Sequence, residues 1–222
     1  MRPPAARALL PDRKPLPASP EWLRLVAVTD EPGSDAARWS ARIAAAVRGG
    51  ATLVQVRAKD AGGRELLELV RHLVETLPVP VIVNDRADIA IIGGAAGVHV
   101  GVDDLPVSAI RSFAPPSFVI GASLGSAVEL AVAKGADYVG IGPAFLSPSK
   151  TDAGAPLSHE EINELQRLAG VPAVAIGGIT ATNARSLLEN CPSLAGVAAV
   201  SALFGAPDPG SAARVLRAAI EK

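Results

Sequence analysis

Residues 79–104 read VPVIVNDRADIAIIGGAAGVHVGVDD, and this stretch contains two short apolar runs that both stop at polar residues. The first run, residues 79–83, is rich in valine and isoleucine, which is typical of a strand buried on both faces. It ends at Asn84 and Asp85. The second run, residues 97–101, is apolar apart from one histidine and leads into a pair of acids. The stretch therefore predicts two adjacent buried strands with carboxylates at their carboxyl ends.

Two of these acids, Asp85 and Asp104, are candidate metal ligands. Because adjacent parallel strands release them at the same edge of the sheet, both carboxylates can face one hard cation. Mg²⁺ accepts one or two carboxylates together with phosphate oxygens. The sequence thus predicts a magnesium site that anchors a diphosphate. The alternative is that both acids simply cap the helices that follow the strands.

The composition favours one domain and excludes several classes of partner. A chain of 222 residues is long enough for one large core. A formal charge of −1, with four phenylalanines, two tryptophans and one tyrosine, provides no basic surface or stacking platform for nucleic acid. We expect no membrane span, because no apolar run approaches the roughly 18 residues required. The single cysteine, Cys191, allows no intramolecular disulfide and is typical of a reducing, cytoplasmic setting.

Residues 1–20 differ from the rest of the chain. They are rich in proline and arginine, show no hydrophobic periodicity, and lack the apolar core of a secretory signal. We expect a disordered N-terminal extension here, followed by a single domain over residues 21–222.

That domain alternates between short apolar runs and amphipathic segments. The alternation predicts a parallel α/β sheet, and eight such units in about 200 residues fit a closed (β/α)₈ TIM barrel. An open doubly wound sheet is the alternative, because periodicity alone does not show closure. The expected strands are residues 23–29, 51–56, 79–83, 97–100, 118–122, 138–141, 171–176 and 197–200. The expected helices are residues 35–48, 63–77, 87–92, 106–113, 126–134, 158–168, 182–190 and 210–221.

The second strand carries a polar trio at its carboxyl end, where barrel active sites lie. Gln55, Arg57 and Lys59 are spaced by two and so point to one face. Two cations directed at the barrel axis need an anionic partner, and a diphosphate supplies one. The alternative is an outward-facing trio in solvent.

Further polar residues follow strands four to six. His99 interrupts the fourth strand and Ser123 ends the fifth, although a lone strand histidine is often a hydrogen-bonded core residue. After the sixth strand, Ser147, Ser149 and Lys150 have the spacing of a loop that wraps phosphate oxygens. An ordinary polar surface loop is the alternative for these three.

The ends of strands seven and eight predict a second anion site. Loops after these strands frequently bind phosphate through backbone N–H groups in barrels, and the glycines of 176–179 allow close approach. The candidate stretches are residues 176–179 and 200–202. Two anion sites suit two phosphorylated small-molecule substrates. Because the chain shows no pattern for a covalent nucleophile, charge stabilisation would carry the catalysis.

The chain resembles the thiamine phosphate synthase family over residues 25–205. The matching motifs occur in the family's order and are specific as a set. They are QVRAK (55–59), VNDRADIA (83–90), GVHVGVDDLP (97–106), GADYVGIGPAFLSPSK (135–150), IGGI (176–179) and VSAL (200–203).

The resemblance implies that a hydroxymethylpyrimidine diphosphate is joined to a thiazole phosphate in a dissociative reaction that releases diphosphate. It places Mg²⁺ on Asp85 and Asp104, and it makes Arg57, Lys59, Ser123 and Lys150 catalytic. It also assigns substrate binding to a larger set. The diphosphate would contact Arg57, Lys59, Asn84, Ser123 and Lys150, and the pyrimidine would contact Gln55 and His99. Ser147 and Ser149 would replace two threonines of the family. The thiazole phosphate would contact Gly178, Val200 and Ser201.

The sequence departs from the family pattern at two places. Val102 stands where the family usually has glutamine, and no histidine follows Ser123. Two other functions stay open: a thiazole tautomerase of the same superfamily, and a non-catalytic phosphate-binding barrel. The oligomeric state is also open, including a homo-oligomer.

Overall fold

The computed structural model describes residues 20–146 and 154–221, and their parallel strands close into one barrel. Each strand pairs with the next along the chain, and β8 pairs with β1 through Ala27 and Ala199. Closure confirms the TIM barrel and excludes the open doubly wound sheet. The strands are β1 (Leu25–Val28), β2 (Leu53–Val56), β3 (Val81–Asn84), β4 (Gly97–Val100), β5 (Val119–Leu124), β6 (Tyr138–Ile141), β7 (Ala173–Ile176) and β8 (Gly196–Ala199).

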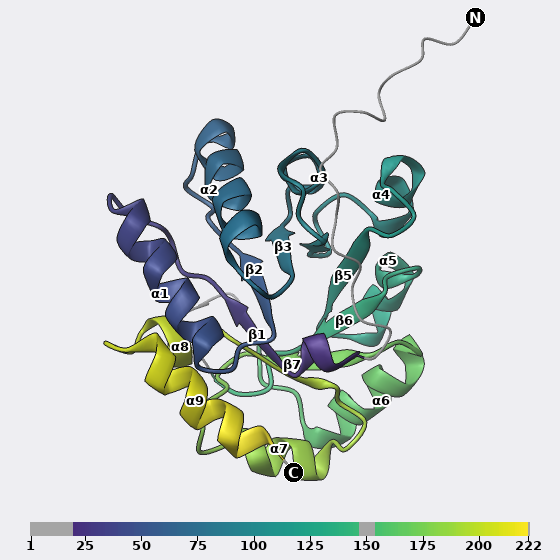
Figure 1. The fold of residues 1–222 in the computed structure, drawn as a ribbon. Helices are drawn as coiled ribbons and strands as arrows, with labels where there is room; N and C mark the ends of the chain where they lie inside the picture. Colours follow the sequence, from purple (N-terminus) through teal and green to yellow (C-terminus); the bar gives the residue numbers. More distant parts are fainter. Residues whose placement is uncertain (1–19, 147–153, 222) are drawn as a thin grey trace, which may run out of the picture.

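The α-helices surround the strands on the outside, as Figure 1 shows, whereas Leu23 of the short helix η2 (Pro20–Leu23) packs with residues that face the barrel axis. The other helices are α1 (Ala36–Arg48), α2 (Gly63–Thr76), α3 (Ala87–Gly93), α4 (Val107–Phe113), η3 (Ala127–Glu129), α5 (Leu130–Ala133), α6 (His159–Ala169), α7 (Ala184–Asn190), α8 (Ser201–Phe204) and α9 (Pro209–Ile220). Within the described residues, none of these helices has the length and apolar character to cross a membrane.

Local signals in the sequence explain where several helices begin. The Asp35 side chain accepts the N–H of Arg38 and caps α1. Ser158 and Glu161 form a reciprocal capping box at the start of α6, as the sequence predicts. The N–H groups of Gly210 and Ser211 at the start of α9 are accepted by a further aspartate.

Three elements differ from expectation. The first strand begins at Leu25, because the expected strand residue Leu23 belongs to the short helix η2. The helix expected over 126–134 is split into η3 and α5, and neither piece has a side-chain cap. The short helix α8 directly after β8 was not expected. The expected N-terminal extension, residues 1–20, lies outside the described residues apart from Pro20.

The strands separate two apolar clusters. Alternate strand residues face outward and pack against the helices, among them Val54 and Val56 of β2. The strand residues between them face the barrel axis and, together with Leu23 of η2, form an inner cluster. This inner cluster contains Leu23, Val26, Val28, Leu53, Ile82, Val119, Tyr138, Val174 and Ala198.

Two aromatic rings pack together in the amino-terminal half of the barrel interior. Trp22 of η2 packs edge-to-face against Tyr138 of β6, with ring centroids 5.4 Å apart. Gly121 of β5 makes room for this tyrosine, because a Cβ at that position would lie 2.3 Å from the ring atoms Cε1 and Cζ. The amino-terminal end of the barrel is therefore packed with side chains, and the polar side chains lie toward the carboxyl ends of the strands.

Candidate active site at the carboxyl ends of the strands

The structure brings Asp85 and Asp104 together, as predicted from their positions after β3 and β4. Asp85 has a φ of 63°, a left-handed conformation that is uncommon for a residue with a side chain. Its N–H donates to the carbonyl of His99 at 2.8 Å, which continues the β3–β4 ladder. Asp104 Oδ2 accepts the N–H of Gly101 at 2.7 Å. Hydrogen bonds to backbone groups thus hold both acids in place. The left-handed conformation of Asp85 is of a type that is common at functional sites.

The carboxyl groups of Asp85 and Asp104 lie close enough to interact electrostatically. Burial first, and then a hydrogen bond and charge repulsion from Asp104, raise the pKa of Asp85 to about 6, while Lys59 and Asn84 oppose the shift. Two acids this close are poorly tolerated as a pair of anions. A divalent cation between them would relieve the repulsion, so the donor set fits Mg²⁺. Among the described residues there is no cluster of three or more His, Cys, Asp or Glu side chains for a metal. Two carboxylates therefore suit a cation that completes its shell with substrate and water.

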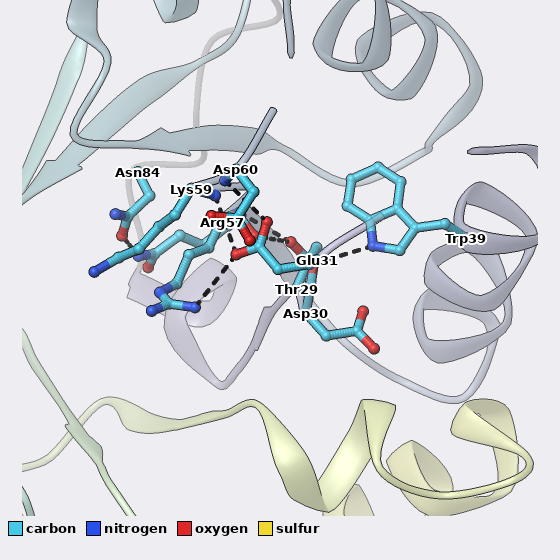
Figure 2. A network of polar contacts seen from close by, with 9 residues as sticks. Thr29, Asp30, Glu31, Trp39, Arg57, Lys59, Asp60 and Asn84 are labelled. Carbon is cyan, nitrogen blue, oxygen red and sulfur yellow. Dashed lines mark hydrogen bonds and ion pairs between the residues drawn. The ribbon is translucent and has the colours of Figure 1, made fainter. Parts of the chain in front are cut away.

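The polar trio divides into the buried amide of Gln55, the half-buried cation of Arg57 and the exposed cation of Lys59. Gln55 faces the interior, is 6% exposed, and donates from Nε2 to Asn84 Oδ1 at 2.7 Å. Arg57 and Lys59 follow the end of the strand, and Figure 2 shows their side chains extending to the same side as Asn84. Arg57 Nη1 lies 3.8 Å from Glu31 Oε1. The alternative of an outward-facing trio is excluded for Gln55, because Val54 and Val56 pack against the helices.

His99 lies inside the barrel between two hydroxyl groups. Its Nδ1 is 2.9 Å from the Tyr138 hydroxyl, and its Nε2 is 3.1 Å from Ser123 Oγ. Burial lowers the pKa of His99 to about 4, partly offset by the Asp104 carboxylate. The imidazole is therefore neutral at pH 7, donating from one nitrogen and accepting at the other. It holds Ser123 at the rim of the site.

We expect His99 to make stability depend on pH. The unfolded histidine binds a proton as the pH falls below 6.5, whereas the folded one does so only near 4. The stabilisation is complete above pH 6.5 and is lost as the pH falls toward 4. Between pH 7 and pH 5 the free energy of unfolding should drop by about 2 kcal/mol through this group alone. Urea unfolding of the wild type and His99→Gln at pH 7 and pH 5 measures this change in the free energy of unfolding. Equal changes in the two proteins would contradict the role of His99.

The loops after β7 and β8 provide the residues expected for a second anion site. Gly178 has a φ of 62°, and a Cβ there would lie 2.5 Å from the carbonyl oxygen of Leu146. The glycine thus allows the chain after β6 to approach, a close contact that the sequence did not indicate. Asn183 Nδ2 donates to Gly178 O at 2.9 Å. Val200 caps α8, and Ser201 is its exposed first residue.

Three of the expected site residues lie outside the described part of the chain, and two positions depart from the family pattern. Ser147, Ser149 and Lys150 lie outside the described residues. Val102, one of the departures from the family pattern, is 40% exposed. After Ser123, where the family has a histidine, the N–H of Gly125 donates to Glu129 Oε2 at 2.6 Å.

Sequence reasoning missed three residues that contact the site. Tyr138 lies in the apolar sixth strand, where its sequence context indicates no site role, although its hydroxyl is hydrogen-bonded to His99. Thr29 and Glu31 at the end of β1 contact the backbone of the β2–α2 loop. The signal for Thr29 and Glu31 is their position directly after Val28, the last residue of a strand, where the other site residues also lie.

Comparisons with known proteins agree with this geometry. The model of the family described as Thiamine monophosphate synthase matches residues 25–203. Thiamine-phosphate synthase of Roseiflexus sp. (strain RS-1) is 41% identical over 183 residues, 80% of this chain and 77% of the relative. That of Methanoculleus marisnigri (strain ATCC 35101 / DSM 1498 / JR1) is 45% identical over 182 residues, 80% of this chain and 84% of the relative.

A solved structure is similar over nearly the whole chain. Thiamine phosphate pyrophosphorylase from Pyrococcus furiosus has a TM-score of 0.79 and 34% identity, covering 90% of this chain and 96% of that one. The shared barrel, the matched residues 25–203 and the identity to these relatives lead to one conclusion. The chain belongs to the thiamine monophosphate synthase family.

Proposed function

We propose that the protein is a thiamine phosphate synthase, a transferase that couples hydroxymethylpyrimidine diphosphate to thiazole phosphate and releases diphosphate. The main support is the paired acids Asp85 and Asp104, beside which the cation Lys59 lowers the pKa of Asp85. This combination of acids and a cation suits a magnesium-bound diphosphate. The names of the related proteins point to the same activity.

Asp85 and Asp104 would hold Mg²⁺, and their mutual repulsion in its absence supports this assignment. When bound, the metal would neutralise charge that accumulates on the departing diphosphate. Arg57, Lys59, Asn84, Ser123 and Lys150 would bind the diphosphate oxygens. Fixed charges and donors of this kind stabilise a leaving group without reorganising during the reaction.

The chemistry we propose is dissociative. The bond between the pyrimidine methylene carbon and the diphosphate oxygen breaks first, and the electron pair leaves with the diphosphate. The thiazole nitrogen then donates its lone pair to the methylene cation. Gln55 and His99 would line the pyrimidine pocket, and a neutral His99 adds no positive charge beside that cation.

The thiazole phosphate would occupy the other side of the barrel mouth. Gly178, Val200 and Ser201 would bind it through backbone groups and one hydroxyl. Ser147 and Ser149 would act in the places of the family's two threonines. The two substrates would then face each other across the carboxyl ends of the strands.

A single assay tests this proposal: diphosphate release from both substrates together, with and without Mg²⁺. We expect release that requires both substrates and the metal. Binding of either substrate without turnover would favour a non-catalytic barrel instead.

A second arm of the assay addresses the tautomerase. That reaction needs a group that exchanges protons near neutral pH, whereas burial lowers the pKa of His99 to about 4. We expect no proton exchange on the thiazole carboxylate, followed by NMR in heavy water without the pyrimidine substrate. Rapid exchange that disappears in His99→Asn, without diphosphate release, would show a tautomerase.

Lys150→Ala should affect the two substrates unequally. We expect turnover to fall about tenfold, in line with the loss of a charge-assisted hydrogen bond, while binding of the thiazole phosphate is unchanged. Steady-state kinetics and a titration with thiazole phosphate measure the two effects. An equal loss in both would mean that the two anion sites are assigned the wrong way round.

A further inference from the structure

Glu31 lies in the loop after β1, and its carboxylate contacts three residues of the loop after β2. Oε1 accepts the N–H of Lys59 at 3.1 Å, and Oε2 accepts the N–H of Asp60 at 3.4 Å. The same Oε1 is 3.8 Å from Nη1 of Arg57. Figure 2 shows the carboxylate among these groups. The Glu31 side chain thus contacts the guanidinium of Arg57 and the backbone of Lys59, two of the proposed diphosphate ligands.

The backbone on either side of Glu31 is held in place. Thr29 is completely buried, and its Oγ1 accepts the N–H of Arg57 at 2.9 Å and donates to the carbonyl of Arg57 at 3.2 Å. Trp39 Nε1 donates to the carbonyl of Asp30 at 3.1 Å. Glu31 is therefore presented by a fixed segment, which directs its carboxylate to the β2–α2 loop.

A carboxylate and a phosphate offer similar oxygen acceptors to guanidinium and backbone N–H groups. A diphosphate that binds Nη1 of Arg57 would therefore compete with Glu31. We propose, on the basis of the function proposed above, that Glu31 is a positioning residue that occupies the place of diphosphate at Arg57. In the substrate-free enzyme it keeps Arg57 and the Lys59–Asp60 backbone in position. It gives up Arg57 when diphosphate arrives.

The partial exposure of the pair suits such an exchange. The side chains of Arg57 and Glu31 are 31% and 35% exposed, so water screens their attraction. A multiply charged diphosphate with its metal can displace a weak partner of this kind. The cost of the competition is correspondingly small, and removing the charge of Glu31 should tighten diphosphate binding about three- to fivefold.

Titration calorimetry with inorganic diphosphate and Mg²⁺ on the full chain tests the proposal. Glu31→Gln keeps an acceptor for the Lys59 N–H but removes the charge. Glu31→Ala removes both. Glu65→Gln, an exposed acid in the first turn of α2, is the matched control because it changes net charge equally.

We expect Glu31→Gln to bind magnesium diphosphate more tightly than the wild type and Glu65→Gln, and Glu31→Ala to bind more weakly than Glu31→Gln. The KM for the pyrimidine diphosphate should fall in Glu31→Gln by the same factor, with the KM for thiazole phosphate unchanged. A structural role alone would not separate the two KM values in this way.

Three results would overturn the proposal. Unchanged or weaker diphosphate binding by Glu31→Gln would remove the competition between the two anions. Equal affinities of the Gln and Ala variants would remove the role in holding the Lys59 backbone. Failure of the wild type to bind magnesium diphosphate at all would refute the proposed function, and the role of Glu31 with it.

Discussion

Replacing Asp85 or Asp104 with asparagine should lower turnover at least about 100-fold, since removing one stabiliser of transition-state charge often costs a factor of 10²–10³. Asparagine is the informative substitution at both positions. At Asp85 it tolerates the φ of 63°, and at Asp104 it can still accept the N–H of Gly101. The loss can then be assigned to charge rather than to a misfolded loop.

Both variants should remain folded. Burial and the facing Asp104 raise the pKa of Asp85, so neutralising either acid relieves repulsion in the metal-free protein. We expect an unchanged or higher melting temperature together with a higher Mg²⁺ concentration for half-maximal activity. Asp103→Asn, an exposed neighbour in the same loop, is the control and should retain full activity. More than a tenth of wild-type turnover in both variants at saturating Mg²⁺ would contradict the metal assignment.

The second large effect is structural. Gly121→Ala should lower the free energy of unfolding by about 3 kcal/mol, the upper end of the usual cost of overpacking a core. The new methyl group would lie 2.3 Å from two ring atoms of Tyr138. A shift of that ring would disturb its packing against Trp22 and the hydrogen bond between its hydroxyl and His99.

Urea unfolding measures this effect against Gly63→Ala, whose new Cβ would meet its nearest atom at 3.7 Å, an ordinary contact. The double variant Gly121→Ala/Tyr138→Leu should recover part of the loss, since leucine vacates the space of the ring. If Gly121→Ala is as stable as Gly63→Ala, the tight packing of the barrel interior described above is wrong.

The sequence predicts the strands well because their apolar runs are short and end at polar residues. The spacing of Gln55 from Leu53 places both on the inner face, and the structure confirms this. The ends of β3 and β4 likewise predict that Asp85 and Asp104 meet. These predictions need only strand periodicity and the parallel arrangement of neighbouring strands.

Contacts that depend on loop geometry could not be predicted in the same way. Glu31 reaches the backbone of Lys59 because Thr29 and Trp39 fix the intervening chain, and no periodicity encodes that path. The 3₁₀ helix before β1 was missed for a related reason. Its residue Leu23 is as apolar as a strand residue, and it packs in the inner cluster with residues far along the sequence, such as Tyr138 and Ala198.

The packing of Trp22, Tyr138, His99 and Ser123 has a consequence for changing substrate preference. These side chains form a continuous column from the bottom of the barrel to its mouth. In the function proposed above His99 lines the pyrimidine pocket, so the depth of that pocket would be set by Tyr138 and Trp22, which support His99 from the amino-terminal side of the barrel. A variant designed to accept a longer ring system cannot simply shorten His99, because the tyrosine beneath it would lose its partner. Such a redesign has to rebuild the column from the tryptophan upward.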